Sequence, residues 1–517
     1  FLFGVCCGFL FFKEPDKATM ALDILFINPG NQKAIYQDLA REFTAVDPPI
    51  WASLLAESIR RQGRSVKIHD MNVQGWDDAI RDRLLAEAPR LIAVLVYGHH
   101  PSASTQTMPV VRPLLKDLKA AAPGIPVALG GTHPSALPEQ TLAEEAADYI
   151  VEGEGLYGLL GLLDHLDGRG AFESIPGLWR RTPQGAARTA PPRPIENLDA
   201  ELPGYAWDLL PPLKNYRAHN WQCFQYFERS QTPDFTDVRS PYVSIYTSLN
   251  CPHDCDYCCI HTIFGKPGIK NWSMETVAGW IDTLVQKHGI RNIRFADELF
   301  MLSRARVTRF CELLEERGYD LNIWVYVRID RVFDDLLPRL KKVGVNWVCP
   351  GIESGNADVR ADVNKDLRRD VVSAIQAFRD AGIHVIGNYM FGLPHDTRET
   401  MQQTLDLALE LNCEFANFYT VMAYPGSDLY RRARAAGLVP DRWEAFSQHG
   451  YWTQPLPTEH LSAAQVQTFR DEAFQTYFRH PAYRERVRKL FGQKTCDHLD
   501  KMVSIPIQRR LTETGTP

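Results

Sequence analysis

Four cysteines fall within nine residues of this 517-residue chain, in the stretch CPHDCDYCC at 251–259. Cys251, Cys255 and Cys258 have the spacing C-x-x-x-C-x-x-C, and Cys259 directly follows the third of them. Clustered cysteines bind zinc or an iron–sulfur cluster, form disulfides, or carry out redox chemistry. The stretch therefore leaves three alternatives open: a zinc protein, a disulfide protein or a redox enzyme.

Metal-ligand spacing favours an iron–sulfur cluster over zinc. A structural zinc site needs four ligands, usually two C-x-x-C pairs, and no second pair lies near this stretch. His253 and His261 could contribute, but His253 lies within the loop and has little freedom to reach inward. The adjacent Cys258 and Cys259 do not easily face one metal, so we interpret Cys259 as a small buried residue. Three thiolates around a four-iron cluster leave one iron open to a small molecule.

Composition indicates a reducing, cytoplasmic environment for these thiols. The hydrophobic content of 45% and charged content of 23% are typical of a soluble globular protein. The eleven cysteines do not form an evenly spaced disulfide framework, and we identify no signal peptide with a cleavage site. A net charge of −6 gives no general attraction to nucleic acid or to anionic membranes. We therefore expect no nucleic-acid partner and no stable membrane insertion.

Residues 1–19 differ from the rest of the chain. Their apolar run is about a dozen residues, too short to span a bilayer, and it lacks a basic leading region. Met20 directly precedes a predicted strand. We expect 1–19 to be an extension outside the fold, from an upstream start or a fragment end, with a membrane-touching tail as the alternative.

Residues 20–160 alternate β-rich and helical runs, which is typical of a parallel sheet covered on both faces. We predict a five-stranded, doubly wound, Rossmann-like α/β domain here, followed by a linker at 161–240 rich in Pro, Arg and aromatic residues. The predicted strands are 22–29, 65–70, 91–98, 127–131 and 148–155, and the predicted helices are 49–63, 77–89, 107–123 and 139–146.

A second alternating block at 241–450 contains six βα units, two fewer than a closed eight-fold barrel. We predict a partial, open (β/α)6 barrel, followed by a helical region at 451–517 that either caps the barrel or packs as ordinary helices. The cysteine loop follows the first strand of the block, where parallel barrels build their active sites. The predicted strands are 242–250, 290–297, 322–328, 347–354, 384–394 and 415–424.

The cysteine loop resembles the signature of the radical S-adenosylmethionine (SAM) superfamily, C-x-x-x-C-x-aromatic-C, with Tyr257 as the aromatic residue. The resemblance implies a 4Fe–4S cluster held by Cys251, Cys255 and Cys258, whose open iron binds the amino and carboxylate groups of SAM. It further implies reductive cleavage of SAM to a 5′-deoxyadenosyl radical, with electrons from a donor such as flavodoxin or ferredoxin.

Other strand ends of the barrel match the same superfamily. Asp297 and Glu298, in FADELF, fall where the superfamily holds the methionine amino group, although the usual Gly-Gly-Glu is absent. Arg328 ends the third strand and could pair with a carboxylate or be structural. Glu353, in GIESGN, could bind a ribose hydroxyl, and its alternative is a buried ion pair.

Two later loops also carry glycines at strand ends. FGLP, with Gly392 and Pro394, and AYPGS at 423–427 close the fifth and sixth strands. Their glycines allow a ligand to approach the backbone, and turn formation alone would explain them equally well.

The first domain resembles the cobalamin-binding domain that precedes the barrel in one large radical SAM class. It has no G-x-G-x-x-G after its first strand and no phosphate-binding P-loop. The resemblance implies that one loop lines the cobalamin nucleotide tail and that the loops after strands one and three face the corrin. With no histidine in the first loop, we predict cobalt without a protein histidine ligand; a scaffold that has lost cobalamin is the alternative. These candidate residues are Gly130, Gly131, Thr132 and His133 for the tail, and Asn28 and Gly98 for the corrin.

Three functions are consistent with these features. The first is a cobalamin-dependent radical SAM methyltransferase that methylates an unactivated carbon, or phosphorus, of a small molecule. The second is a cyclase or skeletal rearrangement enzyme with the same cofactors, as the resembling anaerobic porphyrin cyclases are. The third is a non-catalytic cobalamin or cluster sensor, against which the intact cysteine loop and the strand-end motifs argue.

Overall fold

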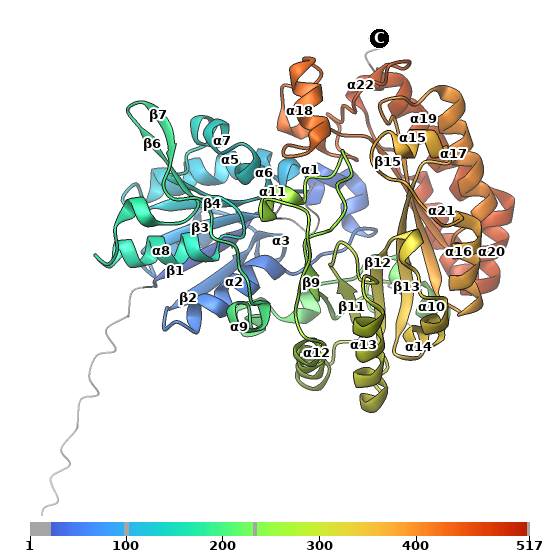
Figure 1. The fold of residues 1–517 in the computed structure, drawn as a ribbon, viewed down its shortest axis with the longest axis horizontal. Coiled ribbons are helices and arrows are strands. Elements are labelled where there is room, and N and C mark those ends of the chain that lie inside the picture. Colours follow the sequence, from blue (N-terminus) through green and yellow to red (C-terminus); the bar gives the residue numbers. More distant parts are fainter. Residues whose placement is uncertain (1–21, 31, 98–102, 231–234, 514–517) are drawn as a thin grey trace, which may run out of the picture.

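Two α/β units lie side by side in the structure, a computed structural model that describes residues 22–30, 32–97, 103–230 and 235–513 (Figure 1). The first unit is coloured blue to green and the second green to red. The predicted extension at 1–19 lies outside the described residues. The observed architecture confirms the predicted fold class: a Rossmann-like domain, a partial barrel and a helical end.

The first unit is built on a sheet whose first five strands run parallel in the order β2-β1-β3-β4-β5. These strands are apolar and buried because α2 and α8 cover one face, while α4, α5 and α7 cover the other. Strand order reverses between β1 and β3, which is where such sheets bind ligands. The strands are β1 (Ile24–Asn28), β2 (Val66–Asp70), β3 (Leu91–Val96), β4 (Val127–Gly131) and β5 (Tyr149–Val151). The helices are α1 (Gln32–Tyr36), α2 (Ile50–Arg60), α3 (Met71–Gln74), α4 (Asp78–Leu85), α5 (Ala103–Ala121), α6 (Thr132–Ala136), α7 (Pro138–Glu144) and α8 (Leu156–Leu166).

The first sheet continues into the segment that we predicted as a linker at 161–240. An antiparallel hairpin, β6 (Leu178–Thr182) and β7 (Gly185–Arg188), pairs with β5 and makes the sheet seven-stranded. Its sequence, LWRRTPQGAAR, lacks a buried apolar run because an edge hairpin leaves its charged side chains in water. Sequence periodicity therefore missed these two strands.

The rest of the predicted linker packs between the two units and contains two short helices, α9 (Leu198–Glu201) and α10 (Phe224–Phe227). Tyr216 donates to Asp70 Oδ2 of the first unit at 2.9 Å. Gln222 donates to the carbonyl of Asn322 in the second unit at 3.0 Å. One cluster of buried apolar residues runs from α2 through this segment into the second sheet. The two units thus share a continuous core.

The second sheet has six parallel strands in the order β15-β14-β13-β12-β11-β8, as predicted for an open barrel. Its strands are β8 (Tyr242–Ile245), β11 (Asn292–Phe295), β12 (Asn322–Val327), β13 (Val345–Glu353), β14 (His384–Phe391) and β15 (Phe415–Thr420), and a small separate pair is β9 (Ser248–Leu249) with β10 (Lys270–Asn271). Its helices are α11 (His261–Phe264), α12 (Met274–His288), α13 (Arg304–Arg317), α14 (Leu337–Lys342), α15 (Ala357–Ala361), α16 (Val371–Asp380), α17 (Arg398–Leu411) and α18 (Asp428–Ala435).

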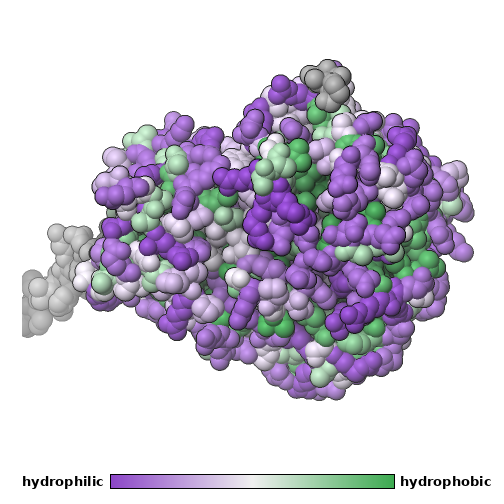
Figure 2. Space-filling model, turned by 45° about the horizontal axis from the view of Figure 1, so that its top comes forward, coloured by the Kyte–Doolittle hydropathy of each residue, from purple (hydrophilic) through white to green (hydrophobic). Residues whose placement is uncertain are grey.

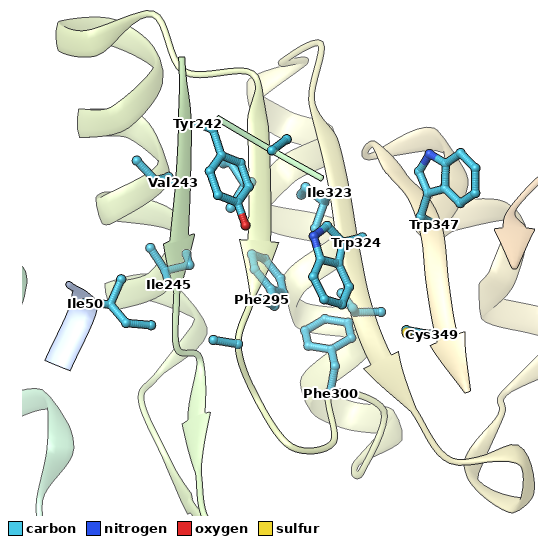
Figure 3. Packing of buried hydrophobic residues seen from close by; sticks show 14 of the residues in the cluster. Ile50, Tyr242, Val243, Ile245, Phe295, Phe300, Ile323, Trp324, Trp347 and Cys349 are labelled. Atoms are coloured by element: carbon cyan, nitrogen blue, oxygen red, sulfur yellow. The ribbon is translucent and has the colours of Figure 1, made fainter. Parts of the chain in front are cut away.

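Large aromatic residues pack along the second sheet. Figure 3 shows Tyr242, Trp324 and Trp347 on β8, β12 and β13, with Phe295 and Phe300 nearby. These side chains are almost wholly buried, and each contributes a large apolar area to the core.

The helical end packs on the second unit, where α19 contacts β15 and α17. Its helices are α19 (Ala463–Arg479), α20 (Pro481–Phe491), α21 (Gln493–Ser504) and α22 (Arg510–Glu513). Hydrophilic residues cover most of the face in Figure 2. Among the described residues, no helix combines the length and apolar character that crossing a membrane requires.

We expect Gly131→Ala to destabilise the first unit strongly. Gly131 has a φ of +140°, and a Cβ there would lie 2.5 Å from the carbonyl carbon of Val96 on the neighbouring strand. Backbone strain and overpacking together should cost about 2 kcal/mol or more. Thermal unfolding followed by circular dichroism measures the change.

Gly279→Ala is the matched control for this substitution. Gly279 lies within α12, and a Cβ there would meet no atom within 4 Å. The same chemical change should stabilise the helix by about 0.5–1 kcal/mol. Equal effects of the two substitutions would contradict the close approach of β3 and β4.

Candidate active site

The three spaced cysteines line one large cavity inside the open barrel. Cys251, Cys255 and Cys258 lie between β9 and α11, and the cavity has a volume of about 450 Å³. Burial raises the pKa of Cys251 to about 11 and that of Cys258 well above its usual range. Such thiols become thiolates when a cation binds them, so the donor set fits a metal cluster.

The arrangement of potential ligands does not fit a single metal ion. No three His, Cys, Asp or Glu side chains in the described part of the chain are grouped closely enough to hold one ion. A four-iron cluster differs, because each thiolate binds a separate iron. Cys259 also borders the cavity but is only 3% exposed, consistent with the buried role predicted for it.

Both ring nitrogens of His261 contact the cysteine loop itself. Nδ1 lies 3.1 Å from Oδ1 of Asn250, and Nε2 lies 2.8 Å from the carbonyl oxygen of His253. The Asn250 Oδ1 also accepts from the amide of Cys251 at 2.8 Å. His261 therefore positions the loop, and the zinc-ligand alternative considered for it does not fit this geometry.

Asp256 anchors the loop from within, and sequence reasoning missed this residue. It is 7% exposed, accepts from Asn364 Nδ2 at 2.6 Å, and pairs with Arg432 of α18 at 2.7 Å. The available signal was an acidic residue placed between two metal-binding cysteines. Tyr257, the predicted aromatic residue, lines the cavity beside them.

Of the acidic pair after β11, Glu298 faces the cavity. Burial raises the pKa of Glu298 to about 7. A cationic ligand beside this carboxyl would favour its charged form. Asp297 does not border the cavity. Its carboxylate accepts from the amide of Thr247 at 2.6 Å and from the hydroxyl of Ser248 at 2.7 Å. Asp297 therefore holds the turn after β8.

Arg328 borders the cavity with part of its guanidinium unused. Its Nε donates to Asp330 at 2.7 Å, and Nη2 donates to the carbonyl of Asp366. The Nη1 atom is buried and has no hydrogen-bond partner among the described residues. An unsatisfied buried donor is costly, so this atom points to a ligand acceptor.

Glu353 borders the cavity and forms the buried ion pair that was its alternative interpretation. Lys365 Nζ lies 3.1 Å from its Oε1, and both side chains are largely buried. Glu353 also has a φ of +64°, in the left-handed region. Such strain in a residue with a large side chain is typical of functional sites. Sequence reasoning did not single out Lys365.

Gly392 and Pro394 are not in the cavity wall; they form a turn against the helical end. A Cβ on Gly392 would lie 2.6 Å from Val466 of α19. The carbonyl of Pro394 accepts from the amide of Glu459 at 3.0 Å, and Asp396 accepts from the Gly392 amide at 3.0 Å. Turn formation and close packing account for this loop.

In the first unit, a smaller cavity of about 80 Å³ lies at the edge where strand order reverses. Asn28 at the end of β1 lines it, together with Leu95 and Val96 of β3. Gly98 and the two histidines after it lie outside the described residues. Its position at this edge is the one predicted for the corrin-facing loops.

The predicted tail-binding loop is covered by the second unit. Gly130, Gly131, Thr132 and His133 are buried, and none lines either cavity. The Trp443 ring packs edge-on against His133 with ring centroids 4.5 Å apart. Burial lowers the pKa of His133 to about 3, so this imidazole is neutral.

The two cavities meet at the boundary between the units. Ile35, Tyr36, Ala103 and Gln106 line both of them. The carboxyl edge of the first sheet thus faces the open side of the barrel, and these four residues form the shared wall.

Comparison with known proteins agrees with this arrangement. The family described as the radical SAM superfamily matches residues 245–408, and the B12 binding domain matches residues 36–163. The chain therefore combines a radical SAM domain with a B12-binding domain. Both matches support an enzyme whose cofactors are a 4Fe–4S cluster, SAM and cobalamin, as predicted.

Relatives and solved structures resemble this chain over most of its length. The uncharacterized methyltransferase PH0819 of Pyrococcus horikoshii is 25% identical over 89% of this chain and 93% of its own length. The anaerobic magnesium-protoporphyrin IX monomethyl ester cyclase of Rubrivivax gelatinosus is 26% identical over 83% and 72%. The methyltransferase TsrM of Kitasatospora setae, solved with tryptophan and a SAM analogue, matches 95% of this chain and 96% of its own with a TM-score of 0.64 at 17% identity. The cobalamin-dependent radical enzyme OxsB covers 93% and 72% with a TM-score of 0.68 at 14% identity.

We expect Cys255→Ala to abolish cluster binding, because it removes one of the three iron ligands. Iron and sulfide content after anaerobic reconstitution measures the loss. Cys259→Ala is the matched control, since it removes a neighbouring thiol that we assign to packing, and it should retain the cluster. Retention in both variants, or loss in both, would contradict the assignment of ligands.

We expect Lys365→Met and Glu353→Gln each to lower the thermal unfolding midpoint, because either leaves one buried charge unpaired, at a cost of about 3 kcal/mol. The double variant should recover most of that loss.

The same double variant separates pairing from ligand binding. If Glu353 also contacts SAM, the double variant should be stable and bind SAM weakly by equilibrium dialysis. If the double variant instead matches the unsubstituted protein in both stability and SAM affinity, Glu353 serves only the ion pair.

Proposed function

We propose that this enzyme transfers a methyl group from SAM to a small molecule, at a carbon or phosphorus atom that itself offers no nucleophilic lone pair. One observation carries the proposal. The cavity lined by the three cysteines is also lined by Tyr36 and Gln106 of the B12-binding unit, which border the smaller cavity as well. The ligand-binding edges of both units therefore face one space of small-molecule size.

The chain's own residues bind and orient the reactants. When bound, the cluster, SAM and cobalamin supply a 5′-deoxyadenosyl radical and a transferable methyl group, which polar chemistry cannot deliver to an unactivated carbon. Cys251, Cys255 and Cys258 would hold the cluster. Glu298 accepts from the amino group of SAM, and its raised pKa reflects a buried carboxyl that gains from a cationic partner.

Arg328 and Glu353 complete the binding of SAM. The unpaired Nη1 of Arg328 donates to the SAM carboxylate, which supplies the acceptor that this buried atom lacks. Glu353, held by Lys365, accepts from a ribose hydroxyl. The cluster would need an external one-electron donor such as flavodoxin or ferredoxin.

A cyclase or skeletal rearrangement is the second candidate. It is supported by similarity to the anaerobic magnesium-protoporphyrin IX monomethyl ester cyclases of Rubrivivax gelatinosus and Cereibacter sphaeroides. The two candidates use the same cofactor sites. They differ in whether the methyl group of SAM is transferred, which would leave S-adenosylhomocysteine.

Product analysis distinguishes the candidates. Anaerobic, cluster-loaded protein with cobalamin would be incubated with methyl-labelled SAM, a reductant and a small-molecule extract. We expect both 5′-deoxyadenosine and S-adenosylhomocysteine by mass spectrometry, with label appearing in a new small molecule.

Cys255→Ala is the control, and it should form no 5′-deoxyadenosine. Formation of 5′-deoxyadenosine without S-adenosylhomocysteine would contradict methyl transfer and support the cyclase or rearrangement candidate. Absence of both products from loaded protein would contradict radical SAM catalysis under these conditions.

A further inference from the structure

One wall of the larger cavity carries more positive than negative charge. Arg470 of α19 borders the cavity and is 3% exposed. Its Nη1 donates to Asp471 at 2.8 Å, and its Nε donates to the carbonyl of Phe418 at 2.8 Å. Arg509, also buried, contacts the same Asp471 with its Nε at 3.2 Å. Two buried guanidiniums therefore share one carboxylate.

The other cationic side chains at this cavity each have a carboxylate partner. These pairs are Arg294 with Asp47 at 3.7 Å, Arg328 with Asp330 at 2.7 Å, and Lys365 with Glu353 at 3.1 Å. Glu298, beside the cysteine loop, is a carboxyl assigned above to SAM. The unmatched positive charge thus lies at the Arg470 wall.

A neutral histidine with an unused ring nitrogen stands beside this charge. Burial, together with the charges of Arg470 and Arg509, holds the pKa of His449 well below its usual range. His449 lines the cavity, and its Nδ1 is buried without a hydrogen-bond partner among the described residues. A neutral imidazole can donate to an anion that Arg470 attracts.

The cavity floor is apolar and aromatic. Trp221 packs against Trp324 with ring centroids 5.1 Å apart and against Phe415 at 6.3 Å. Phe474 and Met502 of the helical end line the same region. Phe415 begins β15 and Trp324 lies in the middle of β12, whereas the cysteine loop follows the carboxyl end of the first barrel strand. The floor therefore lies deeper in the barrel than the predicted SAM site.

We infer that the substrate is a small-molecule carboxylic acid with a bulky apolar body. Its carboxylate pairs with Arg470 and His449, and its apolar body packs on the aromatic floor. A buried, incompletely paired guanidinium gains a charge-assisted hydrogen bond from such a ligand, and the aromatic rings gain apolar contact area. This inference rests on the proposed function, since it names the substrate class for the same cavity.

Binding of matched probes tests the substrate class without turnover. Isothermal titration calorimetry would compare naphthylacetate, naphthylacetamide and naphthylethylamine on protein loaded with cluster and cobalamin. The three share one apolar body and differ in charge. We expect the acid to bind about tenfold to a hundredfold more tightly than the amide, and the amine most weakly.

Substitutions at the charged wall assign the preference to its residues. Arg470→Gln should remove the difference between acid and amide, and Arg470→Lys should keep most of it because the charge remains. Asp471→Asn should widen it, since the shared carboxylate is lost. Arg488→Gln, at an exposed arginine of α20, is the matched control and should change nothing. Iron and cobalamin content shows whether each variant folds.

Two results would overturn the inference: equal affinity for the acid and the amide, or no binding of the acid. If the Arg470→Gln variant still binds the acid more tightly than the amide, the assigned role of Arg470 is wrong. Because the titration uses neither reductant nor turnover, a failure of the proposed function appears separately, as missing products of SAM.

Discussion

The site depends on one geometric constraint: parallel strands of a sheet all end at the same edge. The cysteine loop after β8, Glu298 after β11, Arg328 after β12 and Glu353 at the end of β13 are distant in sequence and share one cavity for this reason. The first unit obeys the same constraint, so Asn28 and Val96 meet at the β1–β3 edge. Because two such edges face each other, residues of both units line one continuous space.

Charge pairing then decides which polar residues are structural and which remain available. Asp297 and Asp256 are fully engaged with neighbouring loops, and both fix the positions of other groups. Arg328 retains an unpaired donor, and Arg470 shares its carboxylate with a second guanidinium. Residues of one chemical type thus differ in role because their partners differ, which burial alone does not reveal.

The sequence predicted the alternation of strands and helices in both units, and it placed the three spaced cysteines in one loop at the end of a strand, because these features follow from apolar periodicity and local spacing. It missed the β6–β7 hairpin, whose arginines hide the pattern of an edge strand. For Gly392 and Pro394 it left ligand binding and turn formation equally open, because the contacts of Gly392 with Val466 and of Pro394 with Glu459 span more than 60 residues and leave no local signal. Lys365 escaped notice because it lies in the loop after α15, outside the strand-end motifs, although its partner Glu353 is only 12 residues away.

The contact between Trp443 and His133 bears on how the molecule is assembled. The short helix carrying Trp443 belongs to the second unit and covers a loop of the first, with α5 packed alongside. A bulky group can reach that loop only while this segment stands away from it. The contact therefore couples access to this loop of the first unit to the position of a segment of the second unit.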